Sequence, residues 1–452
     1  MSVFDGQRLD PATFQLDVDR LQRGWYSDTY FLNIARMLEA LSAEGYRFEG
    51  TRPKELAAGA IETGDIEVEM QIFTRRQPES LIAGTDEALA ILQAGAGHFE
   101  GERFVPTYEG LEIEAVPDGV ILSYGGDPRQ VLPALRIRGR YRDFAILETP
   151  ILGALAEATR VATNVYQVLA AANGKDVQFF PARFAHYKLQ ALHGYAYALA
   201  VHAYRQRHER HSGMYISTDE QGAWWGGRGG GTIAHSAIAC FLGDLEETMI
   251  QFCRHRPLEV PRIALVDFHN DCVGETLRVM ARMWEAYLEE LRAGRPEEAA
   301  RYRLAGVRPD TSGNLRDVSI PSLGDRRLDC GVNPRLVHAL RTAIDNAYQA
   351  WPVPFEYLEE AQRWCQAVRI VVTGGFNPEK IRRFEELEVP VDTYGVGSWL
   401  LSNSDVDGTN NDFTADIVRV RVDGRWIEMA KLGRHASDNP LLERVATKGT
   451  VS

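Results

Sequence analysis

From about residue 151 onward, short runs of apolar and β-branched residues alternate with longer stretches of helical period. This alternation is typical of repeated β/α units, which build a parallel sheet covered by helices. The candidate strands are Met214–Ile216, Arg262–Val266, Arg303–Val307, Arg369–Val372 and Val391–Tyr394. The expected helices are Thr149–Ala172, Ala182–Arg207, His235–Arg254, Val273–Ala293, Pro334–Ala350 and Pro378–Leu387. The pattern predicts a β/α barrel, and with it an α/β fold.

The two ends of the chain have a different texture. Strands joined by turns are expected at Ile66–Phe73, Phe104–Val116 and Val120–Tyr124. Near the other end, Phe413–Val422 and Arg425–Ala430 flank Asp423-Gly424, which is a strong hairpin signal. We therefore expect a mixed α+β domain over residues 1–148 and an incomplete β/α barrel over 149–402. A C-terminal segment, 403–452, is expected to return and complete the N-terminal sheet.

Charge and cysteine usage exclude several classes of function. The formal net charge is −13, with acidic and basic residues mixed along the chain, which argues against a nucleic-acid partner. The five cysteines are widely spaced and contain no CxxC pair, so they indicate neither a disulfide framework nor a zinc site. We recognise no signal peptide and no apolar run of about 18 residues, so we expect a cytoplasmic protein without membrane association.

Polar or glycine-rich residues follow nearly every predicted strand of the barrel. These segments are Ser217-Thr218-Asp219, Asp267–Asp271, Arg308–Gly313, Thr373-Gly374-Gly375 and Gly395-Val396-Gly397-Ser398. Because the loops at the carboxyl ends of barrel strands converge on one mouth, we expect them to share a single site. The last two loops are glycine-rich and lead toward helix starts, where such barrels commonly hold a phosphate with backbone N–H groups.

The other loops carry carboxylates, cations and a histidine. Asp267, Asp271 and Asp310 could hold Mg²⁺, contact ribose hydroxyls, or simply cap the helices that follow them. His235 begins a predicted helix after a glycine-rich run, so its ring is expected near the barrel mouth. Cationic groups that could bind phosphate or carboxylate come from Arg183, Arg228 and Arg308.

The same segments resemble the nicotinate phosphoribosyltransferase family, in particular its archaeal-type branch within the type II phosphoribosyltransferase superfamily. The family's "GT-x-x-H-S" appears as Gly231-Thr232-Ile233-Ala234-His235-Ser236, its "R-x-D-S/T" as Arg308-Pro309-Asp310-Thr311, its "S-G-G" as Thr373-Gly374-Gly375 and its "F-G-V-G" as Tyr394-Gly395-Val396-Gly397. Upstream, Ser27-Asp28-Thr29-Tyr30 is similar to "T-D-x-Y", Glu148-Thr149-Pro150 to "E-x-P" and Phe180-Pro181-Ala182-Arg183 to "F-G-x-R". The motifs run in order over most of the chain.

This resemblance implies an enzyme that forms nicotinate mononucleotide and pyrophosphate from nicotinate and phosphoribosyl pyrophosphate, coupled to ATP hydrolysis, in NAD salvage. It also implies a homodimer or higher homo-oligomer whose active site is shared between subunits. Tyr30 of a neighbouring subunit and Phe180 would stack on the pyridine ring, and Arg183 would face its carboxylate. His235 corresponds to the histidine that the family phosphorylates from ATP. The expected cofactor is Mg²⁺, with ATP as a co-substrate.

The remaining roles follow the same carry-over. We expect Asp267 and Asp310 to take part in catalysis with His235, and Arg308 and Thr218 to bind substrate. The 5′-phosphate is expected at Thr373, Gly374, Gly375, Gly395, Gly397 and Ser398. Asp271 is the candidate Mg²⁺ ligand.

Two alternative functions stay open at this stage. Asp219 stands where nicotinate enzymes usually have serine and nicotinamide enzymes have aspartate, so the substrate could be nicotinamide. An enzyme of another class, a metal-dependent barrel hydrolase, could use Asp267, His269 and Asp271, which would point to one side of an extended segment. A ligand-binding protein without catalysis is a third possibility.

Overall fold

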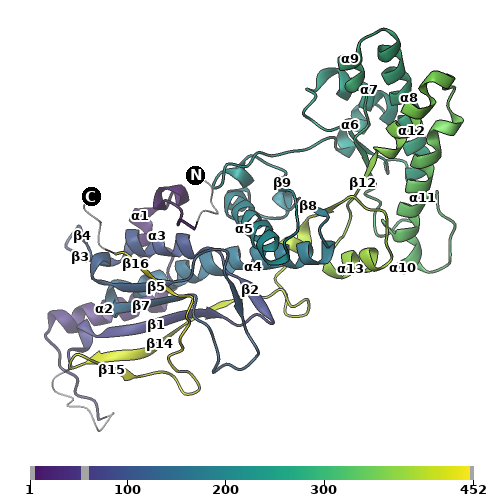
Figure 1. The fold of residues 1–452 in the computed structure, drawn as a ribbon. Coiled ribbons are helices and arrows are strands. Elements are labelled where there is room, and N and C mark those ends of the chain that lie inside the picture. The colour runs from purple at the N-terminus through teal and green to yellow at the C-terminus, as the bar shows by residue number, and fades with distance from the viewer. Residues whose placement is uncertain (1–5, 52–60, 448–452) are drawn as a thin grey trace. The chain divides into compact units, whose positions relative to one another are not determined.

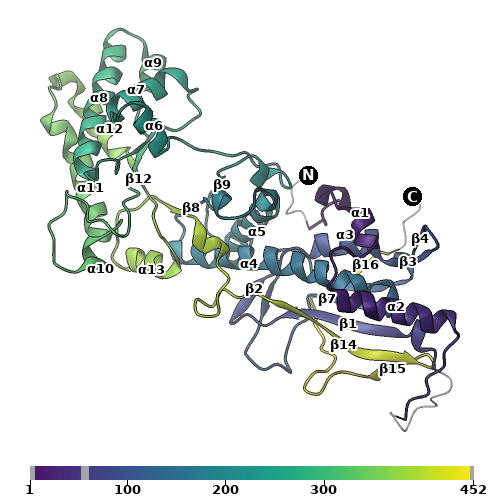
Figure 2. The ribbon, with the colours of Figure 1, turned by 180° about the vertical axis from the view of Figure 1, so that it is seen from behind.

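The structure is a computed structural model that describes residues 6–51 and 61–447. It divides into two compact units (Figures 1 and 2). Unit 1 comprises the described residues up to Tyr166, together with Tyr195–Ala203 and those from Ser402 onward. Unit 2 comprises Gln167–Gly194 and Tyr204–Leu401. Two long helices, α4 (Glu148–Ala172) and α5 (Gln190–His208), contribute residues to both units.

Unit 1 is built on an antiparallel six-stranded sheet with the order β15-β14-β1-β7-β5-β16. Its strands are β1 (Glu67–Thr74), β5 (Glu112–Ala115), β7 (Leu135–Arg140), β14 (Phe413–Val422), β15 (Arg425–Glu428) and β16 (Glu443–Val445). Two smaller pairs are β2 (Glu79–Leu81) with β6 (Ile121–Ser123), and β3 (Gly97–Glu100) with β4 (Arg103–Pro106). Because β14 pairs with β1, the C-terminal segment completes the N-terminal sheet as predicted.

Alternation along β1 gives this sheet two different faces. Val68, Met70 and Ile72 join an apolar core with residues of the helices α1 (Val18–Gln22), α2 (Thr29–Ala43), α3 (Thr85–Gly95) and α4. Glu69 points the other way and is 1% exposed, yet it accepts hydrogen bonds from Arg138 at 2.6 Å and Arg419 at 3.1 Å. A buried carboxylate is tolerated there because arginines from the strands on either side compensate its charge.

Unit 2 contains a parallel six-stranded sheet with the order β10-β11-β12-β13-β8-β9. Its strands are β8 (Asp176–Phe179), β9 (Tyr215–Ile216), β10 (Ile263–Leu265), β11 (Gly306–Arg308), β12 (Arg369–Val372) and β13 (Thr393–Val396). The helices are α6 (His235–Cys240), α7 (Leu245–His255), α8 (Cys272–Arg292), α9 (Pro296–Ala300), α10 (Arg326–Asp329), α11 (Pro334–Asn346), α12 (Leu358–Gln366) and α13 (Pro378–Glu386). The curled sheet has β9 and β10 as its edges, which confirms the predicted incomplete β/α barrel.

The structure differs from the predicted elements in several places. The predicted strand 104–116 is two strands, β4 and β5, with a 3₁₀ turn at Tyr108–Gly110 between them. The barrel region shows further differences. β8 has only four residues and was not among the predicted strands. The predicted helix 235–254 is broken into α6 and α7, because Leu242 and Gly243 adopt left-handed φ values of 56° and 89° and Asp244 caps a new helix. The predicted helix 182–207 begins only at Gln190, after two short 3₁₀ turns.

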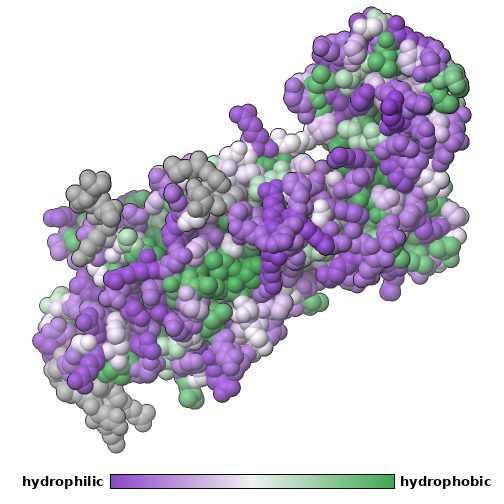
Figure 3. All heavy atoms as spheres, viewed as in Figure 1, coloured by the Kyte–Doolittle hydropathy of each residue, from purple (hydrophilic) through white to green (hydrophobic). Residues whose placement is uncertain are grey.

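The face of the molecule seen in Figure 3 is mainly hydrophilic, with apolar residues gathered in separate groups. Within the described residues, no helix combines the length and the apolar character that crossing a bilayer requires.

Candidate active site

Each predicted loop starts at the carboxyl end of a strand of the parallel sheet. Thr218 lies two residues after β9, Asp267 two after β10, and Asp310 two after β11. Gly374 lies two residues after β12, and Gly397 directly follows β13. Because the strands are parallel, these five positions lie at the carboxyl-terminal edge of the sheet, the edge formed by the ends of the strands. Ligands bind at this edge in open α/β sheets.

At this edge the imidazole of His235 meets the carboxylate of Asp267. His235 Nε2 lies 3.0 Å from Asp267 Oδ1. The Asp267 side chain is 9% exposed and that of His235 is 46% exposed, so a buried carboxylate orients an accessible ring. Burial raises the pKa of Asp267, and the hydrogen bond from His235 opposes that rise. With a proton on Nε2 donated to Asp267, the other ring nitrogen, Nδ1, carries the lone pair that a nucleophile needs.

The next two loops are joined through the carboxylate of Asp310. The Thr373 hydroxyl donates to Asp310 Oδ1 at 2.7 Å, and Thr373 itself is buried. Gly374 and Gly375 follow with φ values of +94° and +66°, a conformation that favours glycine. A Cβ on Gly374 would lie 3.4 Å from the same Asp310 oxygen. The loop therefore holds a carboxylate directly beside a glycine turn.

Arg308 adds a cation to these carboxylates. Its Nη2 donates to the Ile233 carbonyl at 3.0 Å, in the segment that leads to His235. Burial lowers the pKa of Arg308, the charges of Asp310 and Asp267 raise it, and the charge of Arg183 lowers it further. The guanidinium stays charged at any physiological pH. Two arginines and two carboxylates thus share one electrostatic environment.

Aromatic rings pack against the glycine loop that follows β13. The Phe180 N–H donates to the Val396 carbonyl at 2.9 Å. A Cβ on Gly395 would lie 2.8 Å from the Phe180 ring, and a Cβ on Gly397 would lie 2.8 Å from the Phe184 ring. Glycine at both positions is what allows the rings to approach so closely. Ser398, the last predicted phosphate-binding residue, begins a 3₁₀ turn directly after this loop.

Phe184 was not predicted as a site residue. Its ring centroid lies 5.3 Å from the guanidinium carbon of Arg183, and 48% of the residue is exposed. An exposed aromatic ring beside an arginine is suited to a flat anionic ligand. The signal in the sequence was its place directly after Arg183, which the motif comparison passed over.

Asp219 is engaged with the backbone of its own loop. Its Oδ1 accepts a hydrogen bond from the Gly229 N–H at 2.9 Å. Next to it, the Thr218 hydroxyl donates to Gln190 Oε1 at 2.9 Å. A Cβ on Gly229 would come within 2.6 Å of the Thr218 backbone, so the glycine-rich segment closes tightly over this turn. The Asp219 carboxylate holds the glycine-rich segment against this turn through its hydrogen bond with Gly229.

The three residues of the alternative metal site have three different partners. Asp267 bonds His235, as described above, while His269 Nδ1 lies 2.7 Å from Glu275 Oε1. Asp271 caps α8, accepting from Gly274 N at 3.0 Å and from the Ser319 hydroxyl at 3.2 Å. Over the described ranges 6–51 and 61–447, no group of three or more His, Cys, Asp or Glu side chains could hold a metal ion. These contacts give the hydrolase alternative no support. Asp271 caps α8 through Oδ1, and its role as a Mg²⁺ ligand stays a prediction.

Tyr30 belongs to unit 1, where it lies in the first turn of α2. Its hydroxyl lies 3.3 Å from Asp28 Oδ2, and 57% of the residue is exposed. Its role toward the pyridine ring of a neighbouring subunit stays a prediction.

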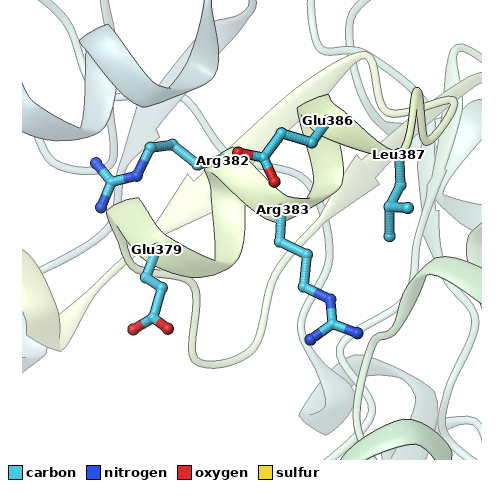
Figure 4. Close-up of a pocket in the computed structure, with 5 residues that line it drawn as sticks. All are labelled: Glu379, Arg382, Arg383, Glu386 and Leu387. Carbon is cyan, nitrogen blue, oxygen red and sulfur yellow. The ribbon is translucent and has the colours of Figure 1, made fainter.

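A surface hollow of about 460 Å³ lies on α13 and the turn after it. It is lined by Glu379, Arg382, Arg383, Glu386 and Leu387 (Figure 4). All five belong to the exposed side of α13 and the turn after it, whereas Pro378, Ile381 and Phe384 form the buried side of that helix. No residue of the predicted site lines this hollow.

Comparison with known proteins agrees with this architecture. Residues 55–159 match the family described as "Quinolinate phosphoribosyl transferase, N-terminal domain". The crystal structure of nicotinate-nucleotide pyrophosphorylase from Pyrococcus furiosus is similar over 95% of this chain and 85% of that chain, with a TM-score of 0.60 and 22% identity. Human nicotinic acid phosphoribosyltransferase is similar over 87% of this chain and 74% of that chain, with a TM-score of 0.50 and 16% identity. The chain shares its fold with these proteins.

Proposed function

We propose that this chain, which has the type II phosphoribosyltransferase fold, transfers the phosphoribosyl group of phosphoribosyl pyrophosphate to nicotinate and couples the transfer to ATP hydrolysis. The products are nicotinate mononucleotide and pyrophosphate, an NAD salvage reaction. The observation that carries the proposal is the Asp310–Thr373 hydrogen bond beside the Gly374-Gly375 turn, with Arg308 in the same electrostatic environment. That arrangement suits a phosphorylated sugar with an anionic leaving group.

The transfer breaks the bond between C1′ and the pyrophosphate oxygen, and the pyridine nitrogen forms the new bond with its lone pair. No general base is needed. Positive charge develops on the ribose ring, and negative charge leaves with the pyrophosphate. Asp310, held by Thr373, stabilises the positive charge on the ribose ring. Arg308 and Arg183 stabilise the negative charges of the departing pyrophosphate and of the pyridine carboxylate. Bound Mg²⁺ would neutralise part of the pyrophosphate charge. Asp267, Asp271 and Asp310 are the carboxylates at the strand ends that could face it.

At the base end, Phe180 and Phe184 lie against the glycines of the β13 loop. The pyridine ring would stack on this aromatic surface, with its carboxylate toward Arg183. A planar guanidinium binds a carboxylate in a two-pronged fashion, which favours an acid over an amide. Asp219 does not oppose this choice, because its Oδ1 already binds the Gly229 backbone.

The His235–Asp267 pair supports the coupling to ATP. In this proposal His235 Nδ1 attacks the terminal phosphate of ATP, ADP leaves, and the imidazolium proton on Nε2 stays hydrogen bonded to Asp267. Water later hydrolyses the phosphohistidine and regenerates the ring. Two observations support this step: a carboxylate lies on one ring nitrogen of His235, and 46% of the His235 side chain is exposed.

The test is to incubate the protein with phosphoribosyl pyrophosphate and Mg²⁺, adding nicotinate, nicotinamide or quinolinate, each with and without ATP. We expect nicotinate mononucleotide from nicotinate, formed faster with ATP. The family match of residues 55–159 makes quinolinate the second candidate. Release of CO₂ with nicotinate mononucleotide from quinolinate alone would replace our choice of substrate. Asp310→Asn is the inactive control, since it keeps the shape of the side chain and removes its charge.

A further inference from the structure

Lys380 lies in the first turn of α13, and its side chain reaches back to the glycine loop before the helix. Its Nζ donates a hydrogen bond to the Gly374 carbonyl at 3.2 Å. The same nitrogen lies 4.0 Å from the centroid of the Phe376 ring and 5.9 Å from that of Phe384. No role was predicted for Lys380 from the sequence.

The Lys380 ammonium has no ion-pair partner within residues 6–51 and 61–447. Burial lowers its pKa to about 8. Among the described residues, no carboxylate forms a salt bridge with it, whereas the Lys175 ammonium in the same unit lies 2.8 Å from Glu385. One carbonyl and the faces of aromatic rings compensate a half-buried cation only in part. Such a cation gains free energy when an anion binds near it.

The hydrogen bond to Gly374 also fixes the orientation of the next donor. The Gly374 carbonyl and the Gly375 N–H belong to one planar trans peptide and point in opposite directions. With the carbonyl held toward Lys380, the Gly375 N–H is directed to the other side of the loop. A hydrogen bond accepted by the carbonyl also polarises the peptide, which makes that N–H a stronger donor.

We infer that Lys380 is a positioning residue for the 5′-phosphate, orienting and polarising the Gly374–Gly375 peptide so that it binds a phosphate dianion. This inference rests on the proposed function and adds a residue to it. The opposing explanation is that Lys380 only packs its aliphatic stem on Phe376 and Phe384. Methionine would serve equally well in that case.

The test compares Lys380→Met with Lys380→Arg and with Arg382→Met. Lys380→Met keeps an unbranched stem and removes the ammonium, while Lys380→Arg restores a charge. Arg382→Met removes a cation two residues further along the same helix, on the side that lines the surface hollow (Figure 4). Dissociation constants are measured by calorimetry on the full chain for ribose 5-phosphate and, separately, for pyrophosphate. Ribose 5-phosphate probes the glycine loop, and pyrophosphate probes the leaving-group end.

We expect Lys380→Met to weaken ribose 5-phosphate binding about tenfold or more, because the variant loses the charge-assisted hydrogen bond that orients the Gly374–Gly375 peptide. Pyrophosphate binding should change less than about twofold, and the KM for phosphoribosyl pyrophosphate should rise more than kcat falls. Lys380→Arg should recover part of the loss, and Arg382→Met should bind like the wild type.

Wild-type binding of ribose 5-phosphate by Lys380→Met, or an equal loss for both ligands, would overturn the inference. So would a loss in Arg382→Met as large as in Lys380→Met, because the anion would then bind at the exposed side of α13. Circular dichroism checks that each variant is folded. If Lys380→Met unfolds, the inference is decided by comparing ribose 5-phosphate binding of Lys380→Arg with that of the wild type. A wild-type protein that binds ribose 5-phosphate but does not use nicotinate would contradict the proposed function alone.

Discussion

The contact of Asp219 with Gly229 leads to a prediction about base selection. If the carboxylate serves only to close its own loop, then Asp219→Ser removes one exposed hydrogen bond between a side chain and the backbone. Such a bond contributes roughly 0.5–1.5 kcal/mol, which corresponds to a loss of about 2- to 12-fold in kcat/KM. Because the loop is shared by any base in the site, the loss should be equal for nicotinate and nicotinamide. The ratio of the two kcat/KM values should stay at its wild-type value.

If Asp219 instead accepts a hydrogen bond from a carboxamide, the same substitution removes a charge-assisted bond of roughly 1.5–3 kcal/mol from nicotinamide alone. The ratio would then shift toward nicotinate by about 12- to 150-fold. The assay is the initial rate of mononucleotide formation with each base, for the wild type and for Asp219→Ser. Asp219→Asn is the matched control, because its side-chain oxygen still accepts from Gly229. A shift of the ratio beyond about tenfold in Asp219→Ser would refute the structural role described here.

Three further predictions concern other side chains. His235→Ala should abolish ATP hydrolysis and the ATP-dependent gain in rate while leaving slow ATP-independent transfer, and undiminished ATP consumption would mean that the pair with Asp267 is structural. Thr373→Val keeps the shape of the side chain but removes the 2.7 Å hydrogen bond to Asp310, so kcat/KM for phosphoribosyl pyrophosphate should fall roughly 10- to 150-fold. An unchanged kcat/KM would mean that this hydrogen bond to Asp310 does not contribute to catalysis. Burial raises the pKa of Glu87 from 4.5 to about 7, so its contribution to stability is present at low pH and is lost as the pH rises through 7. Relative to the wild type, Glu87→Gln should therefore gain stability between pH 5 and pH 8, by up to about 3 kcal/mol in thermal or urea unfolding, and a difference independent of pH would count against the burial of an ionised Glu87.

The alternation of strands and helices was enough to predict the parallel sheet, and the hairpin signal at Asp423-Gly424 was enough to predict the returning segment. These signals are local, because side-chain period and turn chemistry act over a few residues. The position of β8 between β13 and β9 could not be predicted in this way. Its four residues form a strand because two neighbours supply backbone partners, one of them more than 200 positions further along the chain.

In the candidate site, the sequence placed the glycine loops and the acidic residues at the strand ends, since position in a β/α unit follows from the order of elements. The partners of those residues depend on tertiary contacts. Nothing in the spacing distinguishes Asp267, which meets His235, from Asp271, which caps a helix. Lys380 was overlooked for a similar reason, because a lysine in the first turn of a helix is ordinarily solvent-exposed.

The pairing of β1 with β14 has a consequence for synthesis on the ribosome. Glu67 pairs with Arg421, so one of the two neighbours of β1 emerges only after the whole parallel sheet of unit 2 has been translated. Translation at roughly 5–20 residues per second leaves β1, one face of which is apolar, with an open edge for many seconds. Open edges of this kind recruit other strands and lead to aggregation. Pairing of β14 is therefore a late closing step for the sheet of unit 1, and synthesis that stops before residue 413 gives a product prone to misassembly.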